Sequence, residues 1–467
     1  PQSYINQRKA EALGLVAQRY YEMFKRYGGL PWIDHYITMG ESIDMSRMSI
    51  TRTVDSICSL LDRAIAMPEL PERNAVNEFG RVNKVALRML KARVLLWSAS
   101  PLFNPEDNQS YYPSFNKQEL IKHETYDKNR WQEAADACLE AINAAHGAGY
   151  ALYTKYGDPV KDYKAAVTEF PDIDANGTAK GNPEIIWGTR PADSYASETY
   201  QSGSRVTIWS TLKQLRGTVG TYLIPLQNMV DKYELRNGSD QPADYWQTTS
   251  DPYNNLDRRF NATIYHHGYK LGKTVSPFTL DMRMEPAGDQ YPAGAQNFTG
   301  YYLAKFFDDD YIAGAGNYPQ AFWPYMRLSD LYLMYAEALN EVDYESNSGE
   351  ILHYVNLVRN RAGQPNLEDK PGFQATQAYV RECIRKERIV ELCYEDQIYF
   401  DYKRWKVGDK YIGGNMYGMR ITGDMENPTF SKFLYETRVW SSKWYLFPLY
   451  QTDVLTTNGV LAQNPGW

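Results

Sequence analysis

The chain has 467 residues, with 57 acidic and 50 basic side chains and a formal net charge of −7. This acidic balance argues against a protein that binds phosphate backbones, so nucleic acid is not an expected partner. Aromatic residues make up 14% of the chain, and their flat apolar faces with polar edges suit cores, protein interfaces and sugar rings alike. Composition alone does not choose among these three roles.

Helical periodicity appears in pairs along the chain. Apolar residues recur at spacings of three and four in six segments: 6–27, 50–65, 82–96, 131–146, 326–341 and 351–358, the last with Gly363 as its expected C-terminal cap. Alanines interleaved with larger residues let neighbouring helices approach closely, as in tetratricopeptide hairpins. The spacing between pairs is irregular, so we predict a mainly α-helical, irregular scaffold of antiparallel hairpins.

Two other regions differ in character. Residues 147–323 and 407–467 are rich in Gly, Pro, Asn and Tyr, with short helices and short alternating stretches that predict brief strands. We therefore expect one body over residues 1–467, with a helical-hairpin scaffold at 1–146 and 324–406. The two loop-rich regions would carry the ligand surface, because recognition usually occurs on long loops held by a rigid scaffold.

The cysteines and the apolar runs exclude two further classes. Cys58, Cys138, Cys383 and Cys393 are too few and too scattered for a disulfide framework or a metal site, so we expect all four to pack as small apolar residues. No apolar run approaches the roughly 18 residues needed to cross a bilayer. The chain starts within polar, helix-like sequence, so any targeting segment is expected upstream.

Most sequence motifs of catalytic sites are absent or incomplete in this chain. The sequence GYKLGKT at 268–274 has three residues between its glycines, whereas a phosphate-binding loop requires four. His266 and His267 lack a plausible third metal ligand, so a structural role is expected for them.

Glu387 and Glu391 are the strongest candidates for a catalytic pair of carboxylates. They lie one helical turn apart on a face that also carries apolar residues. Two carboxylates at such a separation suit a retaining glycosidase. The rival interpretation, which we favour, is a buried ion network with five arginines close in sequence: Arg359, Arg361, Arg381, Arg385 and Arg388.

A possible calcium loop lies in the middle of the chain. Asp172, Asp174 and Asn176 place oxygen ligands at alternate positions before a glycine, as in the front half of a calcium-binding loop. The twelfth position is Pro183 rather than an acid, and the same residue types also make simple turns. A structural calcium ion and an ordinary turn therefore both stay open, and no other cofactor is expected.

Aromatic clusters in the expected loops are the strongest candidates for ligand contact. Aromatic rings that stack on the C–H faces of sugars, framed by hydrogen bonds from Asn and Arg, form a carbohydrate platform. The candidates are seven aromatic and two polar side chains: Trp323, Phe322, Tyr318, Trp97, Phe103, Tyr111, Tyr112, Asn104 and Arg81. Each aromatic residue taken singly also fits a packing role.

Several segments, in order along nearly the whole chain, together resemble the SusD/RagB family of outer-membrane nutrient-binding lipoproteins. The resembling stretches are AEALGLVAQRYYEMFKRYGGLPWID (10–34), GRVNKVALRMLKARVLLWSASPLFN (80–104), NPEIIW (182–187), DPYNNLDRRFNATIYHHG (251–268), TGYYLAKF (299–306), YMRLSDLYLMYAEALNE (325–341), VNLVRNRAGQP (355–365), IRKERIVELCYEDQIYFDYKRW (384–405) and YLFPLYQTDVLTTNGVLAQNPGW (445–467). Glu387, Arg388, Glu391 and Leu392 match the family's ERxxEL-like stretch, which is structural in character.

The resemblance implies a fold of tetratricopeptide-like hairpins and no enzymatic activity. It also implies a cell-surface protein held in the outer membrane by a lipid anchor at an upstream cysteine, in a portion that this chain lacks. Such a protein captures oligosaccharides as a hinged lid on a SusC-like TonB-dependent transporter. The hairpins then face the transporter and the loop-rich part carries the ligand. A RagB-like subunit that imports peptides and a glycoside hydrolase are the alternatives.

Overall fold

The computed structural model describes residues 1–33, 35–169, 172–173, 179–180, 182–189, 223–271, 278–284, 298–307 and 323–467. Its longer helices are α1 (Gln2–Tyr27), α2 (Ile50–Ile65), α3 (Lys84–Ala99), α4 (Asn129–Gly147), α5 (Pro159–Thr168), α11 (Leu328–Arg361) and α12 (Gln377–Leu392). The shorter helices are α8 (Gln227–Val230), α9 (Tyr245–Thr248), α10 (Arg259–Thr263), α13 (Ile398–Arg404), α14 (Gly408–Tyr411) and α15 (Gln451–Thr456). Single turns of 3-10 helix are η1 (Val76–Glu78), η2 (Gln118–Leu120), η3 (Leu367–Asp369) and η4 (Ser442–Tyr445).

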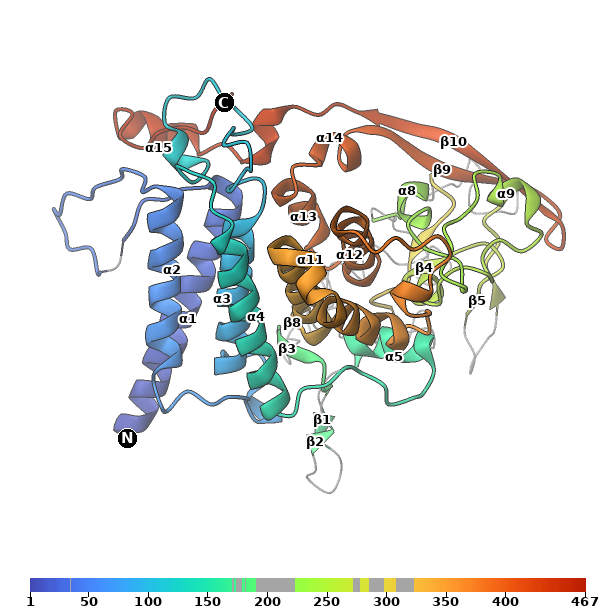
Figure 1. Ribbon diagram of the computed structural model, residues 1–467, viewed down its shortest axis with the longest axis horizontal. Helices are drawn as coiled ribbons and strands as arrows, with labels where there is room; N and C mark the ends of the chain where they lie inside the picture. Colours follow the sequence, from blue (N-terminus) through green and yellow to red (C-terminus); the bar gives the residue numbers. More distant parts are fainter. Residues whose placement is uncertain are drawn as a thin grey trace, which may run out of the picture.

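The long helices pack side by side in chain order. Figure 1 shows α1 to α4 as a group of near-parallel rods, followed by α11 and α12 towards the centre of the molecule. Close approach is built into the sequence at Gly14 of α1, where a Cβ would lie 2.7 Å from Leu87 Cδ2 of α3. This arrangement confirms the predicted scaffold of helix hairpins.

Side-chain caps fix where several of these helices begin. The Asn83 Oδ1 accepts a hydrogen bond from the Ala86 N–H at 2.9 Å at the start of α3, and Asp158 Oδ1 accepts one from Val160 at 2.9 Å at the start of α5. Each cap satisfies a backbone donor that the first helical turn leaves without a partner.

Helix α11 is two helices joined at a bend. Asp343 has φ −171° and ψ 106°, which is extended backbone inside an otherwise helical run. The two arms match the two periodic segments predicted at 326–341 and 351–358. The second arm ends before Gly363, whose φ of +72° is the left-handed conformation expected of a C-terminal glycine.

The remaining chain forms five separate two-stranded antiparallel sheets in the described residues. They pair β1 (Asp172–Ile173) with β2 (Ala179–Lys180), β3 (Ile185–Gly188) with β8 (Pro324–Arg327), β4 (Ile264–Tyr265) with β7 (Tyr302–Leu303), β5 (Lys270–Leu271) with β6 (Phe278–Thr279), and β9 (Gly414–Gly423) with β10 (Pro428–Arg438). The β9–β10 hairpin is the long arm along the upper right of Figure 1.

A second hydrophobic core lies under β4, β5, β7 and the β9–β10 hairpin. Aromatic rings dominate it: Tyr253 stacks on Phe260 at 5.7 Å between centroids and on His266 at 4.1 Å, and Tyr301 and Phe430 meet its edges. The loop-rich region is therefore packed around buried tyrosines, which accounts for part of the unusual tyrosine content.

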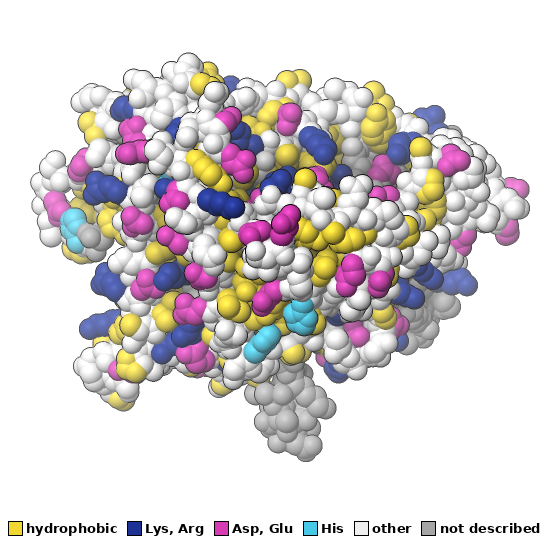
Figure 2. All heavy atoms as spheres, viewed as in Figure 1, with side chains coloured by type: hydrophobic (Ala, Val, Ile, Leu, Met, Phe, Trp, Pro, Cys, Tyr) yellow, Lys and Arg dark blue, Asp and Glu magenta, His cyan; other side chains and the backbone are white. Residues whose placement is uncertain are grey.

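The molecular surface carries charges of both signs. Figure 2 shows Lys and Arg side chains interspersed with Asp and Glu over the face in view. All four cysteines are free thiols; Cys138 and Cys393 are buried, as predicted, and Cys58 and Cys383 are partly buried. Within the described part of the chain, none of the helices has the length and apolar character needed to cross a membrane.

Candidate functional site

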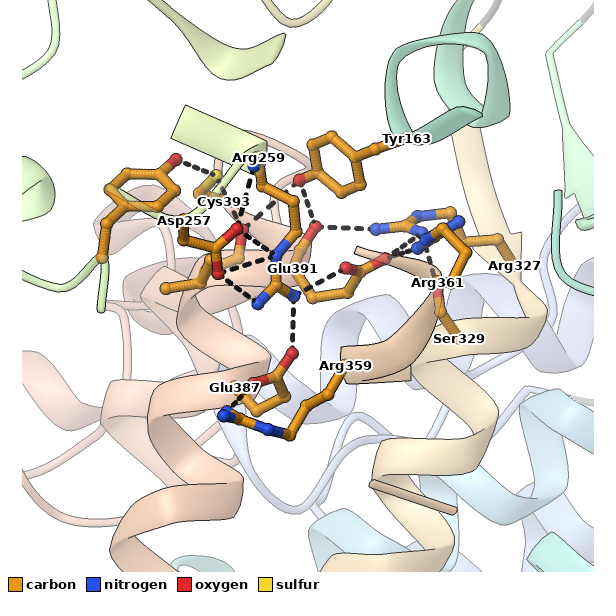
Figure 3. A network of polar contacts seen from close by, with 12 residues as sticks. Tyr163, Asp257, Arg259, Arg327, Ser329, Arg359, Arg361, Glu387, Glu391 and Cys393 are labelled. Carbon is orange, nitrogen blue, oxygen red and sulfur yellow. Dashed lines mark hydrogen bonds and ion pairs between the residues drawn. The ribbon is translucent and has the colours of Figure 1, made fainter. Parts of the chain in front are cut away.

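Glu387 and Glu391 of α12 lie inside a buried ion network rather than in a cleft (Figure 3). The Arg259 guanidinium contacts both carboxylates, with Nη1 2.5 Å from Glu387 Oε1 and 3.0 Å from Glu391 Oε2. The second Glu391 oxygen pairs with Arg327 at 2.7 Å and with Arg361. These contacts confirm the ion-network interpretation of the pair.

The electrostatics of Glu391 favour its ionised form over that of a proton donor. Burial alone would raise the pKa of this carboxyl, but Arg361, Arg327 and Arg259 hold it well below its usual range. A carboxylate so compensated stays ionised, and its side chain is 0% exposed to solvent. Among the five arginines expected around the pair, Arg359 and Arg361 do contact it, with Arg359 3.1 Å from Glu387.

The network also joins the helical scaffold to the loop-rich region. Arg327, at the end of β8, bridges Glu184 and Glu395 with contacts of 2.7 Å each. Lys305 reaches Glu395 at 2.6 Å from the segment after β7. Sequence reasoning missed these partners, because they come from segments far from α12 whose charges have no periodic signal of their own.

Four of the predicted ligand contacts are wrong, because their side chains lie in the interior. Trp97, Phe103, Asn104 and Tyr111 are 4%, 0%, 2% and 7% exposed. Trp97 packs 6.2 Å from both Phe103 and Phe400, so the aromatic run after α3 closes the end of the main core. No ring face is left on these residues for a sugar.

The Asn104 side chain links its own loop to the segment around Asp127 by hydrogen bonds. Its side-chain amide donates to the Asp127 carbonyl at 2.9 Å, and its Oδ1 accepts from the Asp127 N–H at 3.0 Å and from Arg130 at 3.1 Å. The amide nitrogen and the amide oxygen of Asn104 therefore both bond within the protein. Tyr112 is half-buried beside the C-terminal Gly466, and its proposed ligand contact stays a prediction.

Trp323 is different, because it is only partly buried at the open end of the β3–β8 ladder. Its backbone N–H donates to Thr189 Oγ1 at 3.0 Å, and its carbonyl accepts from the Thr189 N–H at 3.0 Å. Its ring lies 5.3 Å from the ring of Phe306, which is 2% exposed. The indole is thus supported from the interior while part of it reaches the surface.

Phe79 and Gly188 lie beside Trp323. A Cβ on Gly188 would be 2.8 Å from the Trp323 carbonyl oxygen and 3.3 Å from Phe79 Cζ, so only glycine allows both groups to come this close. The Trp187 indole N–H donates to the Gly80 carbonyl at 3.0 Å and holds the segment after η1 against β3. Phe79 gave no sequence signal, because its neighbours show no helical or strand period.

Arg73 and Arg81 line a small hollow next to β3 together with Phe79. Arg81 has 37% of its side chain exposed and pairs with Glu11, with 2.5 Å from Nη2 to Oε2. The Arg73 guanidinium lies 4.2 Å from the Tyr150 ring centroid and donates to the Gly149 carbonyl at 2.9 Å. We call Arg73, Phe79, Arg81, Thr189 and Trp323 the strand-end face; in Figure 1 its strands β3 and β8 lie between the α1–α4 group and α5.

The rest of the predicted candidates fall outside the described residues or stay untested. Tyr318, Phe322, Asp174 and Asn176 lie outside the described residues, as does the end of the GYKLGKT segment. Asp172 is described only through its backbone pairing with β2. The calcium site therefore stays a prediction, and within the described residues no three His, Cys, Asp or Glu side chains are grouped to hold a metal ion.

The two adjacent histidines are structural, as predicted. His266 is buried, and its ring nitrogens contact the His267 carbonyl at 2.8 Å and Asn261 Oδ1 at 3.0 Å. Burial lowers the pKa of His266 to about 4, so the ring is neutral near pH 7.

Residues 183–467 match the sequence model of the SusD family. SusD-like protein P2 of Formosa agariphila is 28% identical over 170 residues, which cover 36% of this chain and 30% of that protein. The match therefore spans less than a third of this relative's length.

Two of the solved structures that share the fold illustrate the range of similarity. A SusD-like protein from Bacteroides fragilis has a TM-score of 0.75 at 24% identity, over 100% of this chain and 81% of that one. Surface glycan-binding protein A from Bacteroides thetaiotaomicron, in complex with laminarihexaose, has a TM-score of 0.53 at 16% identity, over 99% and 79% of the two chains. At these identities the likeness establishes the architecture of tetratricopeptide-like hairpins.

Proposed function

The chain belongs to the SusD family, and we propose that it binds an oligosaccharide on its strand-end face and does not cleave it. The observation that carries this proposal is the partly exposed indole of Trp323, backed by the buried ring of Phe306. Supported rings of this kind stack on the C–H faces of sugars. The complex of a structural neighbour with laminarihexaose shows that this architecture accommodates a glycan ligand in that protein.

The polar groups around Trp323 suit a neutral ligand. Arg73 and Arg81 offer guanidinium N–H groups, and Thr189, which hydrogen-bonds to the backbone of Trp323, is exposed. Arg81 is already paired with Glu11, so the face presents donors without a large unbalanced charge. A few hydrogen bonds and one or two stacked rings give modest affinity, which permits release of the ligand after capture.

The non-catalytic assignment is supported by the state of the paired carboxylates. Glu387 and Glu391 are both held by arginines in the interior, so neither can reach a glycosidic bond from this position. A glycosidase also needs one carboxyl group whose pKa is high enough to donate a proton, and the pKa of Glu391 is shifted the opposite way.

The partner that the family suggests is a SusC-like TonB-dependent transporter. We propose that the protein acts at the cell surface in the outer membrane, held by a lipid anchor upstream of this chain, and closes as a lid over the transporter. The α1–α4 hairpins would then face the transporter, leaving the strand-end face to the ligand.

The test begins with a glycan array on the purified chain and continues with Trp323→Ala. We expect the substitution to weaken binding of the selected glycan by about 1–3 kcal/mol with little change in melting temperature. Trp467→Ala is the matched control, because Trp467, the last residue of the sequence, is 44% exposed and lies outside the strand-end face.

Three results would reject the proposal. A Trp323→Ala protein that melts early but binds normally would assign the indole to the core. Binding of peptides with no response to any glycan would favour a peptide importer. Release of reducing ends from a polysaccharide, lost in Glu387→Gln, would favour a hydrolase.

A further inference from the structure

A hollow of about 490 Å³ lies between α8, the turn after α12, helices α13 and α14, and β9. Its wall is largely apolar and aromatic, with Leu226, Met229, Tyr394, Tyr402 and Met416 among the lining residues. The volume is in the range typical of small-ligand pockets. None of its lining residues belongs to the strand-end face, so this is a separate site.

Two lysine ammonium groups meet over one ring in this hollow. Lys232 Nζ lies 4.4 Å and Lys410 Nζ 4.9 Å from the centroid of Tyr411, which stacks on Tyr402 at 4.8 Å with an angle of 18° between the rings. Neither ammonium group forms an ion pair with any residue that the structure describes. The aromatic ring compensates a positive charge only partly.

The acidic residue nearest to these lysines in sequence is already engaged. Asp231 accepts a hydrogen bond from Gln227 Nε2 at 2.7 Å on one oxygen and pairs with Lys432 at 2.7 Å on the other. Arg438, which also lines the hollow, pairs with Glu436 at 2.5 Å. Asp231 and Glu382 act on Lys232 only as neighbouring charges, and no described acid forms an ion pair with Lys232 or Lys410, so the hollow can accept the anionic group of a ligand.

Burial destabilises the charged form of Lys232, whereas Lys410 is exposed. Burial first, and then the charges of Lys410 and Lys386, lower the pKa of Lys232. Nearby Lys386, by contrast, has a carboxylate partner, because it forms an ion pair with Asp240. A ligand carboxylate between Lys232 and Lys410 would relieve the same cost in the hollow.

The β9 edge at this hollow is closed to an added peptide strand. The Asn228 side chain donates to the Asn415 carbonyl at 3.0 Å and accepts from the Tyr417 N–H at 2.7 Å. These are the backbone groups that an extended peptide would use to pair with a strand. The flat rings of Tyr394 and Tyr402 instead suit the C–H faces of a pyranose.

We propose that this hollow binds a uronic acid monosaccharide or disaccharide. Lys232 and Lys410 hold its carboxylate. The sugar ring packs against Tyr394, Tyr402 and Met229. This site is independent of glycan capture at Trp323 and adds selectivity for acidic sugars to the protein.

The test is calorimetric titration of the whole chain with three acidic disaccharides: digalacturonate, dimannuronate and cellobiuronate. We expect at least one of them to bind and its neutral analogue to bind at least about tenfold more weakly. Lys232→Gln should reduce the affinity about tenfold or more, because it removes a charge-assisted hydrogen bond. Lys232→Arg should retain much of it.

Two controls separate this site from other effects. Lys117→Gln removes an exposed lysine elsewhere and should leave the affinity unchanged. Trp323→Ala should also leave it unchanged, so failure of the strand-end proposal and failure of this one are distinguishable. A melting curve for each variant confirms that it is folded.

Several outcomes would overturn the inference. One is the absence of binding to all three acidic disaccharides, and another is equal affinity for the neutral analogues. A third is an unchanged affinity in folded Lys232→Gln. A fourth is equally tight binding of an acidic tripeptide, which would make the hollow a peptide site.

Discussion

The buried ion network and the hollow beside α14 treat charge in opposite ways. In the network, Glu391 is enclosed by Arg259, Arg327 and Arg361, and every charge has a partner in the protein. In the hollow, Lys232 and Lys410 both lie near the ring of Tyr411, and neither forms an ion pair with an acid that the structure describes. Charges that are paired within the protein hold two regions of the chain together, whereas charges without an ion-pair partner can contribute binding energy to a ligand.

Trp97 and Trp323 show a similar contrast between an enclosed and an accessible side chain, here without charge. Trp97 is enclosed by Phe103 and Phe400, so its ring stabilises the fold and has no surface left for recognition. Trp323 has Phe306 behind it and remains partly exposed. A ring with support on one side is both rigid and accessible, which is what stacking on a sugar requires.

The largest effect is expected from removing the charge at the centre of the network. Glu391→Gln leaves three buried arginines without their shared carboxylate and should cost about 3–5 kcal/mol of unfolding free energy. Urea denaturation measures it. Glu382→Gln is the control, because this acid is 53% exposed where it pairs with Arg385, and its loss should cost no more than about 1 kcal/mol.

The same contrast predicts a pH dependence. The pKa of Glu391 in the folded protein lies below its ordinary value of 4.5. Its stabilising contribution is therefore complete above about pH 4.5 and declines as the pH falls towards the folded value, because the unfolded state then binds more protons. Equal stability of Glu391→Gln and Glu382→Gln at pH 7 would contradict the assigned role.

Trp97→Ala should cost nearly as much, about 3–5 kcal/mol, because it leaves a cavity in a packed core. Trp323→Ala, compared under identical urea denaturation, should cost far less. Glycan affinity should follow the reverse order among folded variants. If both substitutions destabilise the protein equally, the distinction between an enclosed and a supported ring does not hold.

A third prediction concerns Lys403 of α13, which is 0% exposed. Its ammonium lies 3.9 Å from the Phe447 ring centroid and has no hydrogen-bond partner among the described residues. Burial, and then the charge of Arg26, lower the pKa of Lys403 to about 7. The charged form is therefore the destabilised one.

Lys403→Met should therefore stabilise the protein by about 2 kcal/mol at pH 6, after allowing for the lost cation–π contact. Wild-type stability should rise between about pH 7 and 10.5, because the unfolded lysine keeps its proton there while the folded one loses it. The gap between variant and wild type should consequently shrink at pH 9.5. A constant gap from pH 6 to 9.5 would show that Lys403 does not titrate in this range.

The helices could be predicted from the sequence because their signal is local. The periodic segments of α1 and of the two arms of α11 are each complete within some 20 residues, and the turn at Gly363 follows from its residue type. The ion network was half predictable for the same reason. Arg359 and Arg361 lie close to α12 in the chain, but Arg259 and Arg327 reach it only through the tertiary fold.

The surface could not be predicted in the same way. Trp97 and Trp323 both lie shortly before a proline, within an aromatic cluster, and look alike in sequence. What separates them is Phe400 of α13, which covers Trp97 from a distant part of the chain. Likewise, nothing near Lys232 indicates that Lys410 meets it over Tyr411. Exposure and pairing are properties of the whole fold.

The smallest effect compares one kind of contact in buried and in more open surroundings. Asn83 caps α3 from a position that is 3% exposed, with a bond of 2.9 Å to the Ala86 N–H. Ser49 caps α2 from a half-buried position with a longer bond of 3.3 Å to the Arg52 N–H. Water can replace the lost acceptor more easily at Ser49.

Asn83→Ala should therefore cost about 1–2 kcal/mol of unfolding free energy and Ser49→Ala about 0.5 kcal/mol. Urea denaturation of both variants measures the difference. Asn83→Ser supplies a hydroxyl acceptor and should recover part of the loss, which distinguishes the cap from simple packing at this position. If Ser49→Ala cost as much as Asn83→Ala, burial would not set the strength of these caps, and the contrast between enclosed and accessible polar groups would lose its simplest case.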